Sequence, residues 1–323
     1  MRVLITGITG FAGGHLAEAL LARGGADLHG LSRKAEWPLE WQHLAGTVQI
    51  HAQDLMIATD LHALLAAIQP DWIFHLAGYA HAGRSFAEAD AAWQGNLQAT
   101  RNFYEAIARW GARPRILYVS SGLIYGEADA PDAPCSESQP LRPASPYAAS
   151  KAAADLASFQ YSRFPGLDIV RVRPFNHIGP RQQPAYAIPG FASQIAAIER
   201  GRQPPVVETG DLNSRRDLTD VRDMVRAYIH LLEKGKTGEV YNAGSGTAYR
   251  MRDVLDKLLA ISKVQVTVRP RAPETRPREM GVARADYSKL QRETGWRPNF
   301  SLEQTLADTL EYWRMTMEKT DHG

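Results

Sequence analysis

Residues 6–13 read Thr-Gly-Ile-Thr-Gly-Phe-Ala-Gly, between the apolar run 3–5 and a helical pattern near residues 13–23. Gly7, Gly10 and Gly13 stand at GxxGxxG spacing. A glycine-rich turn between a strand and a helix aims backbone N–H groups and a helix N-terminus at a diphosphate. The position of this turn therefore predicts a dinucleotide site. The residues expected to form its phosphate cradle are Gly7, Thr9, Gly10, Phe11 and Ala12.

Short apolar runs alternate with helical patterns through residue 173. We expect strands at residues 3–6, 27–31, 48–51, 72–76, 115–120, 168–172 and 240–242, and helices near 13–23, 60–68, 92–110 and 147–163. Such alternation implies a parallel sheet covered on both faces. The predicted fold class is α/β, a Rossmann-type doubly wound parallel sheet with a smaller C-terminal substrate-binding domain.

The character of the chain changes beyond Arg173. Segments 174–190 and 269–280 are dense in Pro, Arg and Gly, which interrupt regular structure. We therefore predict two interleaved domains. Residues 1–173 and roughly 213–245 would form the dinucleotide-binding Rossmann domain, and residues 174–212 and 246–323 the substrate-binding domain.

Composition narrows the class of protein. The 323 residues are 44% apolar with a net charge of +2, which gives no reason to expect nucleic acid or a membrane as partner. Cys135 is the single cysteine, so no internal disulfide can form, and we expect no metal site. No apolar run approaches the roughly 20 residues that a bilayer requires, and Met1 leads straight into a strand. These features predict a cytoplasmic enzyme.

Tyr147 and Lys151 stand four residues apart in Tyr-Ala-Ala-Ser-Lys, so on a helix they share one face. A nearby ammonium favours phenolate, which predicts a lowered pKa and an acid/base role for the tyrosine. The alternative is an ordinary helix pair, with Lys151 in solvent and Tyr147 half-buried. Together with the glycine turn, the pair indicates hydride chemistry with a nicotinamide dinucleotide.

The end of the second strand bears on the choice of dinucleotide. Ser32-Arg33-Lys34 offers a hydroxyl and two cations where NAD-binding chains carry an acid. This favours NADP(H) as the cofactor, although NAD(H) is left open. The alternative is that Arg33 and Lys34 are solvated surface cations without a role in binding. Asp54 and Leu55 should border the adenine, although Asp54 could instead cap a helix. Leu76-Ala77-Gly78 should lie beside the nicotinamide ribose.

Several motifs in order resemble the extended short-chain dehydrogenase/reductase family, in its nucleotide-sugar branch, from end to end. They are TGITGFAGGHL at 6–16, HLAG at 75–78, SSGLIYG at 120–126, SPYAASK at 145–151, RVRPFNHIGP at 171–180, RRDLTDVRD at 215–223 and TGW at 294–296. By this resemblance Tyr147 is the acid/base, and Lys151 lowers its pKa and holds the nicotinamide ribose. Ser121 is implied to hydrogen-bond the reacting oxygen, which suits a hydroxyl at the end of a strand.

Leu123 departs from the 4,6-dehydratases of this family, which carry an acidic residue at the matching position. Elimination of water needs that extra proton transfer, and leucine cannot supply it. An epimerase, which needs only Ser/Thr, Tyr and Lys, usually keeps NAD tightly bound. The preference of Arg33 and Lys34 for NADP fits a reductase instead, because a reductase exchanges its cofactor in every turnover.

The resemblance also implies the substrate site. Asn176, Arg216 and Arg276 match ligands of the sugar nucleotide's diphosphate, for which the arginine fork is suited, and Glu279 matches an acid that contacts the ribose hydroxyls. The alternatives are a salt bridge of Arg216 to a neighbouring aspartate and a solvated loop for Arg276. His81 follows the fourth strand and is either a second acid, a contact to a sugar hydroxyl, or a surface residue.

Within the branch the chain looks most like GDP-4-keto-6-deoxy-D-mannose reductases of deoxysugar biosynthesis. That implies NADPH-dependent reduction of the C4 keto group to give GDP-D-rhamnose. A 4-epimerase with tightly bound NAD, the same reduction on a dTDP-linked sugar, and a non-catalytic dinucleotide-binding protein are the alternatives. The resemblance also implies a homodimer through helices 92–110 and 147–163, which carry Trp93, Leu97, Ile107, Leu156 and Phe159. The alternative is that many of these residues pack against the sheet without any dimer.

Overall fold

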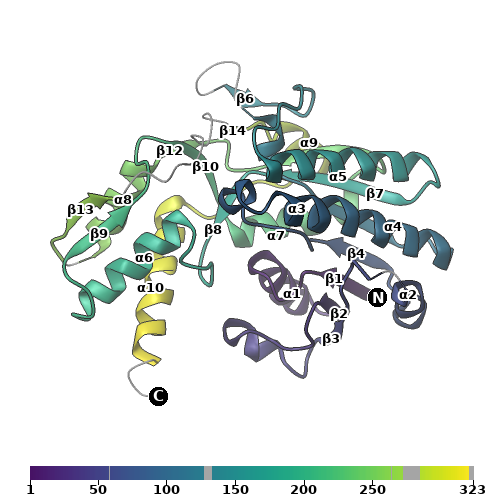
Figure 1. Ribbon diagram of the computed structural model, residues 1–323, viewed down its shortest axis with the longest axis horizontal. Helices are drawn as coiled ribbons and strands as arrows, with labels where there is room; N and C mark the ends of the chain where they lie inside the picture. Colours follow the sequence, from purple (N-terminus) through teal and green to yellow (C-terminus); the bar gives the residue numbers. More distant parts are fainter. Residues whose placement is uncertain (58, 127–132, 263, 272–283, 320–323) are drawn as a thin grey trace.

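The centre of the protein is a parallel seven-stranded sheet. The computed structural model describes residues 1–57, 59–126, 133–262, 264–271 and 284–319 (Figure 1). In spatial order the strands are β11 (Val240–Ala243), β7 (Asp168–Pro174), β5 (Arg115–Val119), β4 (Trp72–His75), β1 (Arg2–Thr6), β2 (Asp27–Ser32) and β3 (Gln49–Ala52). Every neighbouring pair is parallel. All seven expected strands and the doubly wound fold class are confirmed.

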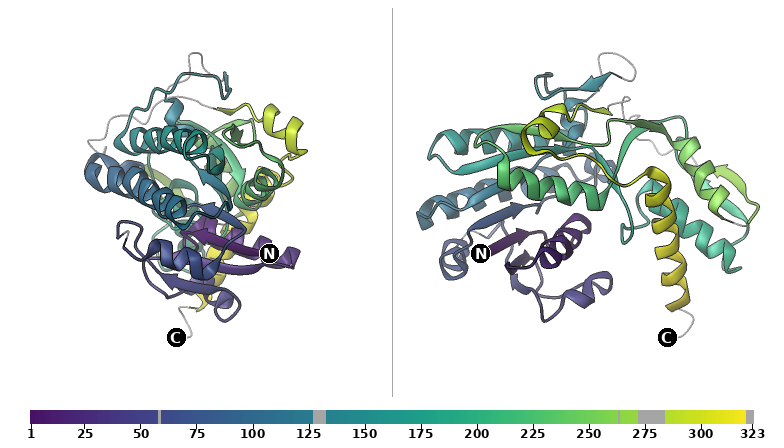
Figure 2. Two further views of the ribbon diagram at one scale, coloured as in Figure 1. Left: turned by 90° about the vertical axis from the view of Figure 1, so that its right-hand side faces the viewer. Right: turned by 180° about the vertical axis from the view of Figure 1, so that it is seen from behind.

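Helices cover both faces of this sheet (Figure 2). One layer contains α1 (Phe11–Arg23) and α7 (Val221–Lys234), and the other contains α2 (Leu61–Ile68), α4 (Ala99–Trp110) and α5 (Pro146–Arg163). The strands supply both cores because successive side chains point to opposite faces. Val3 and Ile5 pack in the cluster with α1 and α7, whereas Leu4 between them packs in the cluster with α2 and α4.

The helix expected near residues 92–110 is interrupted. It consists of α3 (Ala89–Trp93), a π-helical segment (Gln94–Gln98) and α4. Such π segments are rare and often accompany functional sites. This one buries the side chain of Asn96 beside α5, where its Nδ2 donates to Ser150 Oγ at 2.9 Å.

The chain after Arg173 contributes a second group of elements with an apolar cluster of its own. Figure 1 shows α6, α8, α10, β9 and β13 grouped apart from the seven-stranded sheet. The elements of this second group are β8 (Asn176–Ile178), α6 (Ala187–Glu199), β9 (Val206–Thr209), β10 (Arg215–Asp220), β12 (Ala248–Arg250), α8 (Met251–Ile261), β13 (Thr267–Pro270) and α10 (Leu302–Lys319). Three further elements lie beside the region of the seven-stranded sheet, namely β6 (Pro134–Cys135), β14 (Arg284–Ala285) and α9 (Ser288–Thr294). The exact domain limits stay a prediction.

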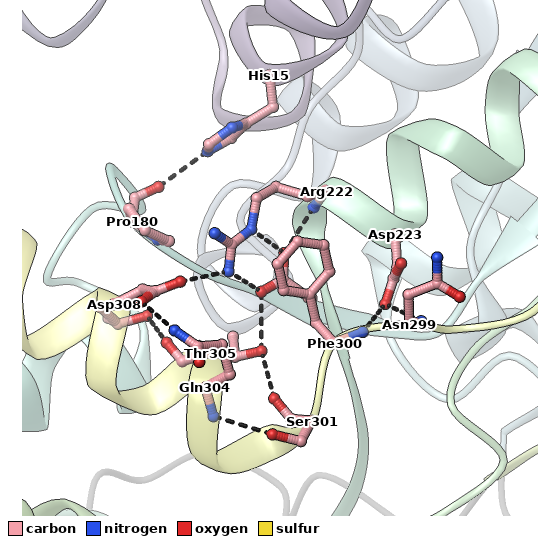
Figure 3. A network of polar contacts seen from close by, with 12 residues as sticks. His15, Pro180, Arg222, Asp223, Asn299, Phe300, Ser301, Gln304, Thr305 and Asp308 are labelled. Carbon is pink, nitrogen blue, oxygen red and sulfur yellow. Dashed lines mark hydrogen bonds and ion pairs between the residues drawn. The ribbon is translucent and has the colours of Figure 1, made fainter.

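A polar network connects the motif at 215–223 to the C-terminal helix (Figure 3). Asp220 caps α7 by accepting from Arg222 N at 2.8 Å, and Thr305 of α10 donates to the other carboxylate oxygen at 2.8 Å. The Arg222 side chain pairs with Asp220 and also with Asp308 of α10 at 2.7 Å. This network holds α10 against the start of α7, close to where β10 ends.

No helix in the described part of the chain combines the length and the apolarity needed to cross a bilayer. The cytoplasmic location stays a prediction.

Candidate active site

The glycine turn is shaped by close backbone contacts. Gly7 has φ +73°, and a Cβ there would lie 2.9 Å from the backbone nitrogen of Ala77. A Cβ on Gly13 would lie 2.3 Å from the carbonyl oxygen of Gly7, so α1 packs directly on the turn. Gly10 caps α1 without a side chain, which leaves the first N–H groups of the helix directed outward. This is the arrangement that binds a diphosphate.

A buried hydrogen-bonded chain positions the loop after β4. Ala77 N donates to Thr6 Oγ1 at 3.0 Å, Thr6 Oγ1 lies 2.8 Å from His75 Nδ1, and His75 Nε2 lies 3.0 Å from Thr100 Oγ1. Burial, with a smaller effect of Lys151, lowers the pKa of His75 to about 3, so this imidazole is neutral. The chain therefore holds Leu76-Ala77-Gly78 against the glycine turn without adding a charge.

The end of β2 approaches the same turn, since Ser32 Oγ lies 3.1 Å from Thr9 Oγ1. Arg33 and Lys34 follow it and are exposed. Asp54 caps a turn rather than a helix, because its Oδ1 accepts from Met56 N at 2.9 Å. The Leu55 side chain is buried in the core cluster that includes α2, and the Leu55 carbonyl accepts from Asn102 Nδ2 at 2.9 Å.

Tyr147 and Lys151 lie in the first two turns of α5. Ser145 caps this helix by accepting from Ala148 N at 3.1 Å, and Pro146 occupies its first turn. The Lys151 side chain is 6% exposed, and its Nζ donates to the Val119 carbonyl at 2.7 Å. The alternative of a solvated lysine is therefore wrong.

Burial moves the two pKa values in opposite directions. It raises the pKa of Tyr147 to about 12, although the neighbouring Ser121 hydroxyl acts to lower it. It lowers the pKa of Lys151 to about 8, with Asp155 acting to raise it. The expected lowering of the tyrosine pKa is not found, because loss of hydration is the largest effect on the phenol. The phenol is thus protonated at neutral pH and suited to donate a proton.

Ser121 follows β5 and begins a single 3₁₀ turn, Gly122–Tyr125. Its Oγ accepts from Leu123 N at 3.2 Å, and the residue is 7% exposed. The Leu123 side chain, next to it, is 37% exposed and offers an apolar surface where a proton-transferring group would be needed for elimination.

His81 belongs to an aromatic group beside this centre. Its ring stacks on Tyr186 with centroids 6.0 Å apart and meets Tyr79 edge-on, also at 6.0 Å. Tyr186 in turn contributes to the raised pKa of Tyr147, so this group lies close to the phenol. Neither Tyr79 nor Tyr186 was predicted, and neither was Asn96, since only the fold brings their segments together.

The structure describes two of the three residues expected to hold the substrate's diphosphate, Asn176 and Arg216. Asn176 on β8 pairs in register with Leu218 on β10, two residues beyond Arg216. Asp217 is engaged by the backbone N–H groups of Ser245, Gly246 and Ala285. Arg276 and Glu279 lie outside the residues that the structure describes.

A family model described as GDP-mannose 4,6 dehydratase matches residues 4–309. The GDP-6-deoxy-D-mannose reductase of Pseudomonas aeruginosa is 33% identical over 97% of both chains. The structure of RMD from P. aeruginosa with NADPH has a TM-score of 0.84 and 31% identity, covering 98% of this chain and 99% of that one. The UDP-glucose 4-epimerase of Thermus thermophilus with NAD has a TM-score of 0.85 and 29% identity, covering 97% and 99%.

The chain belongs to the GDP-mannose 4,6 dehydratase family, within the extended short-chain dehydrogenases/reductases. The relatives named above include a reductase and an epimerase, so membership by itself leaves the reaction open.

The packing of α1 on the glycine turn makes Gly13 intolerant of a side chain. We expect Gly13→Ala to lower the free energy of unfolding by roughly 1–3 kcal/mol, because the new methyl meets backbone that cannot move aside. Thermal and urea unfolding measure the change. Gly210→Ala is the matched control, since a Cβ there would meet nothing within 4 Å. Equal stability of the two variants would contradict the packing argument.

Proposed function

We propose that this protein reduces the C4 keto group of a nucleotide-linked 4-keto-6-deoxyhexose with NADPH. The favoured substrate is GDP-4-keto-6-deoxy-D-mannose, which would give GDP-D-rhamnose. The observation that carries the proposal is the meeting of Ser121, Tyr147 and buried Lys151 at the carboxyl edge of the sheet, next to the glycine turn. The similarity to the P. aeruginosa reductase supports it.

The residues present fit a nicotinamide dinucleotide. The start of α1, where no side chain accepts from the first N–H groups, and the side-chain-free surface of Gly7 and Gly10 suit its diphosphate, and Lys151 lies beside the loop 76–78 where the ribose is expected. The bound cofactor would supply the hydride.

Tyr147, protonated at neutral pH, would donate its proton to the C4 oxygen as charge develops there. The Ser121 hydroxyl would donate to the same oxygen, and the Lys151 ammonium would stabilise the phenolate left on Tyr147. Dehydration of the sugar would need a further group that transfers a proton near Ser121, and Leu123, which occupies that position, cannot transfer one. Among the alternatives, an epimerase would carry NAD through purification and act without added cofactor, and a dTDP-linked substrate would leave the same residues in the same roles.

Replacing the phenol tests the reaction. We expect Tyr147→Phe to lower the rate of NADPH oxidation by about 100-fold or more, because a positioned general acid contributes about that much. The assay follows absorbance at 340 nm with the keto sugar made in situ by a separate dehydratase. Tyr312→Phe, on α10, should keep full activity. Near-normal turnover by Tyr147→Phe would exclude the proposed role.

Removal of the two cations beyond Ser32 tests the choice of cofactor. We expect Arg33→Ala/Lys34→Ala to raise the KM for NADPH about tenfold or more and to leave that for NADH nearly unchanged, because only NADPH carries the 2′-phosphate. Arg23→Ala, at the far end of α1, is the control for loss of a surface cation. An equal effect on both cofactors would show that the two cations are merely solvated.

We also propose a homodimer, formed through exposed apolar side chains of α3 and α5. Trp93, Leu156 and Phe159 are 40%, 57% and 43% exposed, and Leu156 and Phe159 stand three residues apart, on one face of α5. Ile107, by contrast, is fully buried in the core, which agrees with the alternative that some of these apolar residues pack against the sheet.

Light scattering at micromolar concentration should give the mass of a dimer. Leu156→Glu/Phe159→Glu should give a monomer, because two carboxylates would be desolvated in the interface. Leu39→Glu, at an equally apolar exposed position away from α5, should leave the dimer intact. A monomeric wild-type protein would remove the proposal.

A further inference from the structure

An aspartate continues the line of catalytic candidates along α5. Tyr147, Lys151 and Asp155 follow one another at intervals of four residues, so their side chains share one face of the helix. Lys151 reaches the Val119 carbonyl of β5, and Asp155, which is fully buried, reaches Arg171 of β7. A buried carboxylate needs partners that stay charged.

Two arginines of β7 supply those partners. Arg171 Nη1 donates to Asp155 Oδ1 at 2.6 Å, and Arg173 donates to both carboxylate oxygens at 3.1 Å. The arginines are 7% and 5% exposed. Arg173 also donates to Tyr125 Oη at 2.8 Å, and Arg171 to the Gly238 carbonyl at 2.9 Å, so neither can turn away. We call these three residues the Asp155 cluster.

The surroundings of Lys151 are otherwise neutral or cationic. The neutral His75 of β4 and the neutral phenols of Tyr118 on β5 and Tyr147 on α5 face it, with the ammonium 5.3 Å from the centre of the Tyr118 ring. The arginines of the Asp155 cluster are cations. Asp155, one turn further along the same face of α5, is the anion that favours the charged form of the lysine.

We propose that Asp155 is a positioning residue for the reduction, which keeps Lys151 charged in its buried place, and that Arg171 and Arg173 limit how strongly it does so. The proposal rests on the role given to Lys151 in the proposed function. Its physical basis is the balance of buried charges. A carboxylate one helical turn away stabilises the ammonium, and each arginine paired with that carboxylate offsets part of the effect.

The cluster therefore makes two predictions of opposite sign. Asp155→Asn leaves three cations without an anion and should lower the pKa of Lys151 from its value of about 8 by about one unit, a tenfold loss in proton affinity. Arg171→Met removes one cation and should raise the pKa. The double variant should return the pKa close to that of the wild type, because the net charge of the group is restored.

The measurement is NMR titration of the full-length protein labelled with ¹³C at lysine Cε. The Lys151 resonance is identified by its absence from Lys151→Met. Asp168→Asn is the matched control, since Asp168 also accepts from an arginine, Arg115, at 2.8 Å, but at the opposite end of β7. It should leave the Lys151 titration unchanged.

Unchanged titration in the single variants, or shifts of the same sign in both, would overturn the proposal and leave the Asp155 cluster as a purely structural ion pair. If Asp155→Asn fails to fold, the Lys151 pKa in Arg171→Met tests the proposal by itself: an upward shift supports the proposal and an unchanged pKa overturns it. The titration needs no substrate. If the Lys151 pKa shifts as expected but the protein shows no reductase activity, the proposed function is refuted, whereas the proposed effect of Asp155 on Lys151 stands. In an active enzyme, the alkaline limb of kcat should move with the titration, because the ammonium is lost as the pH rises through its pKa.

Discussion

The backbone of Gly7 lies against the backbone of Ala77, and the site depends on that contact. It brings the turn after β1 and the loop after β4 together at the place where the strand order reverses, since β1 has β2 on one side and β4 on the other. Open parallel sheets bind ligands in the crevice at such a point. The Thr6–His75 hydrogen bond maintains the contact from inside the core, with a histidine too buried to charge.

Burial then gives the tyrosine and the lysine their chemistry. On a solvated helix the two side chains would titrate close together and both would be protonated at neutral pH. In this fold the phenol becomes a weaker acid and the ammonium a stronger one. That combination suits proton donation by the tyrosine, but it leaves a cation in a site from which water is largely excluded. A buried carboxylate on the next turn of the same helix meets that requirement, and its own charge is held by two arginines.

Two groups of contacts attach the second region of the chain to the first, in addition to the stacking of His81 on Tyr186. His15 of α1 contacts the Pro180 carbonyl at 3.0 Å, and Phe11 stacks on His177, so the loop after β8 rests on the helix of the glycine turn. In the second group, Asp220 and Arg222 hold α10 at the beginning of α7 (Figure 3). Asn176 lies on β8, which leads to the loop at Pro180, and Arg216 lies on the paired strand β10, which ends at Asp220, so both groups of contacts help to place these two residues.

Local pattern determined the strands of the sheet, the helical regions between residues 13 and 163, the glycine turn, and the placing of Tyr147 and Lys151 at the start of one helix, but it did not predict α7 or the π segment. These follow from spacing and from alternation, both of which act within a few residues. The tertiary structure decided that Lys151 is buried, that the phenol's pKa rises instead of falling, that Ile107 is core, and that the aromatic group around His81 and the Asp155 cluster exist. Burial and long-range ion pairs depend on segments that are far apart in the chain, and no local sequence pattern shows which of these segments come into contact. That is why the identity of the candidate residues could be predicted from the sequence while their protonation could not.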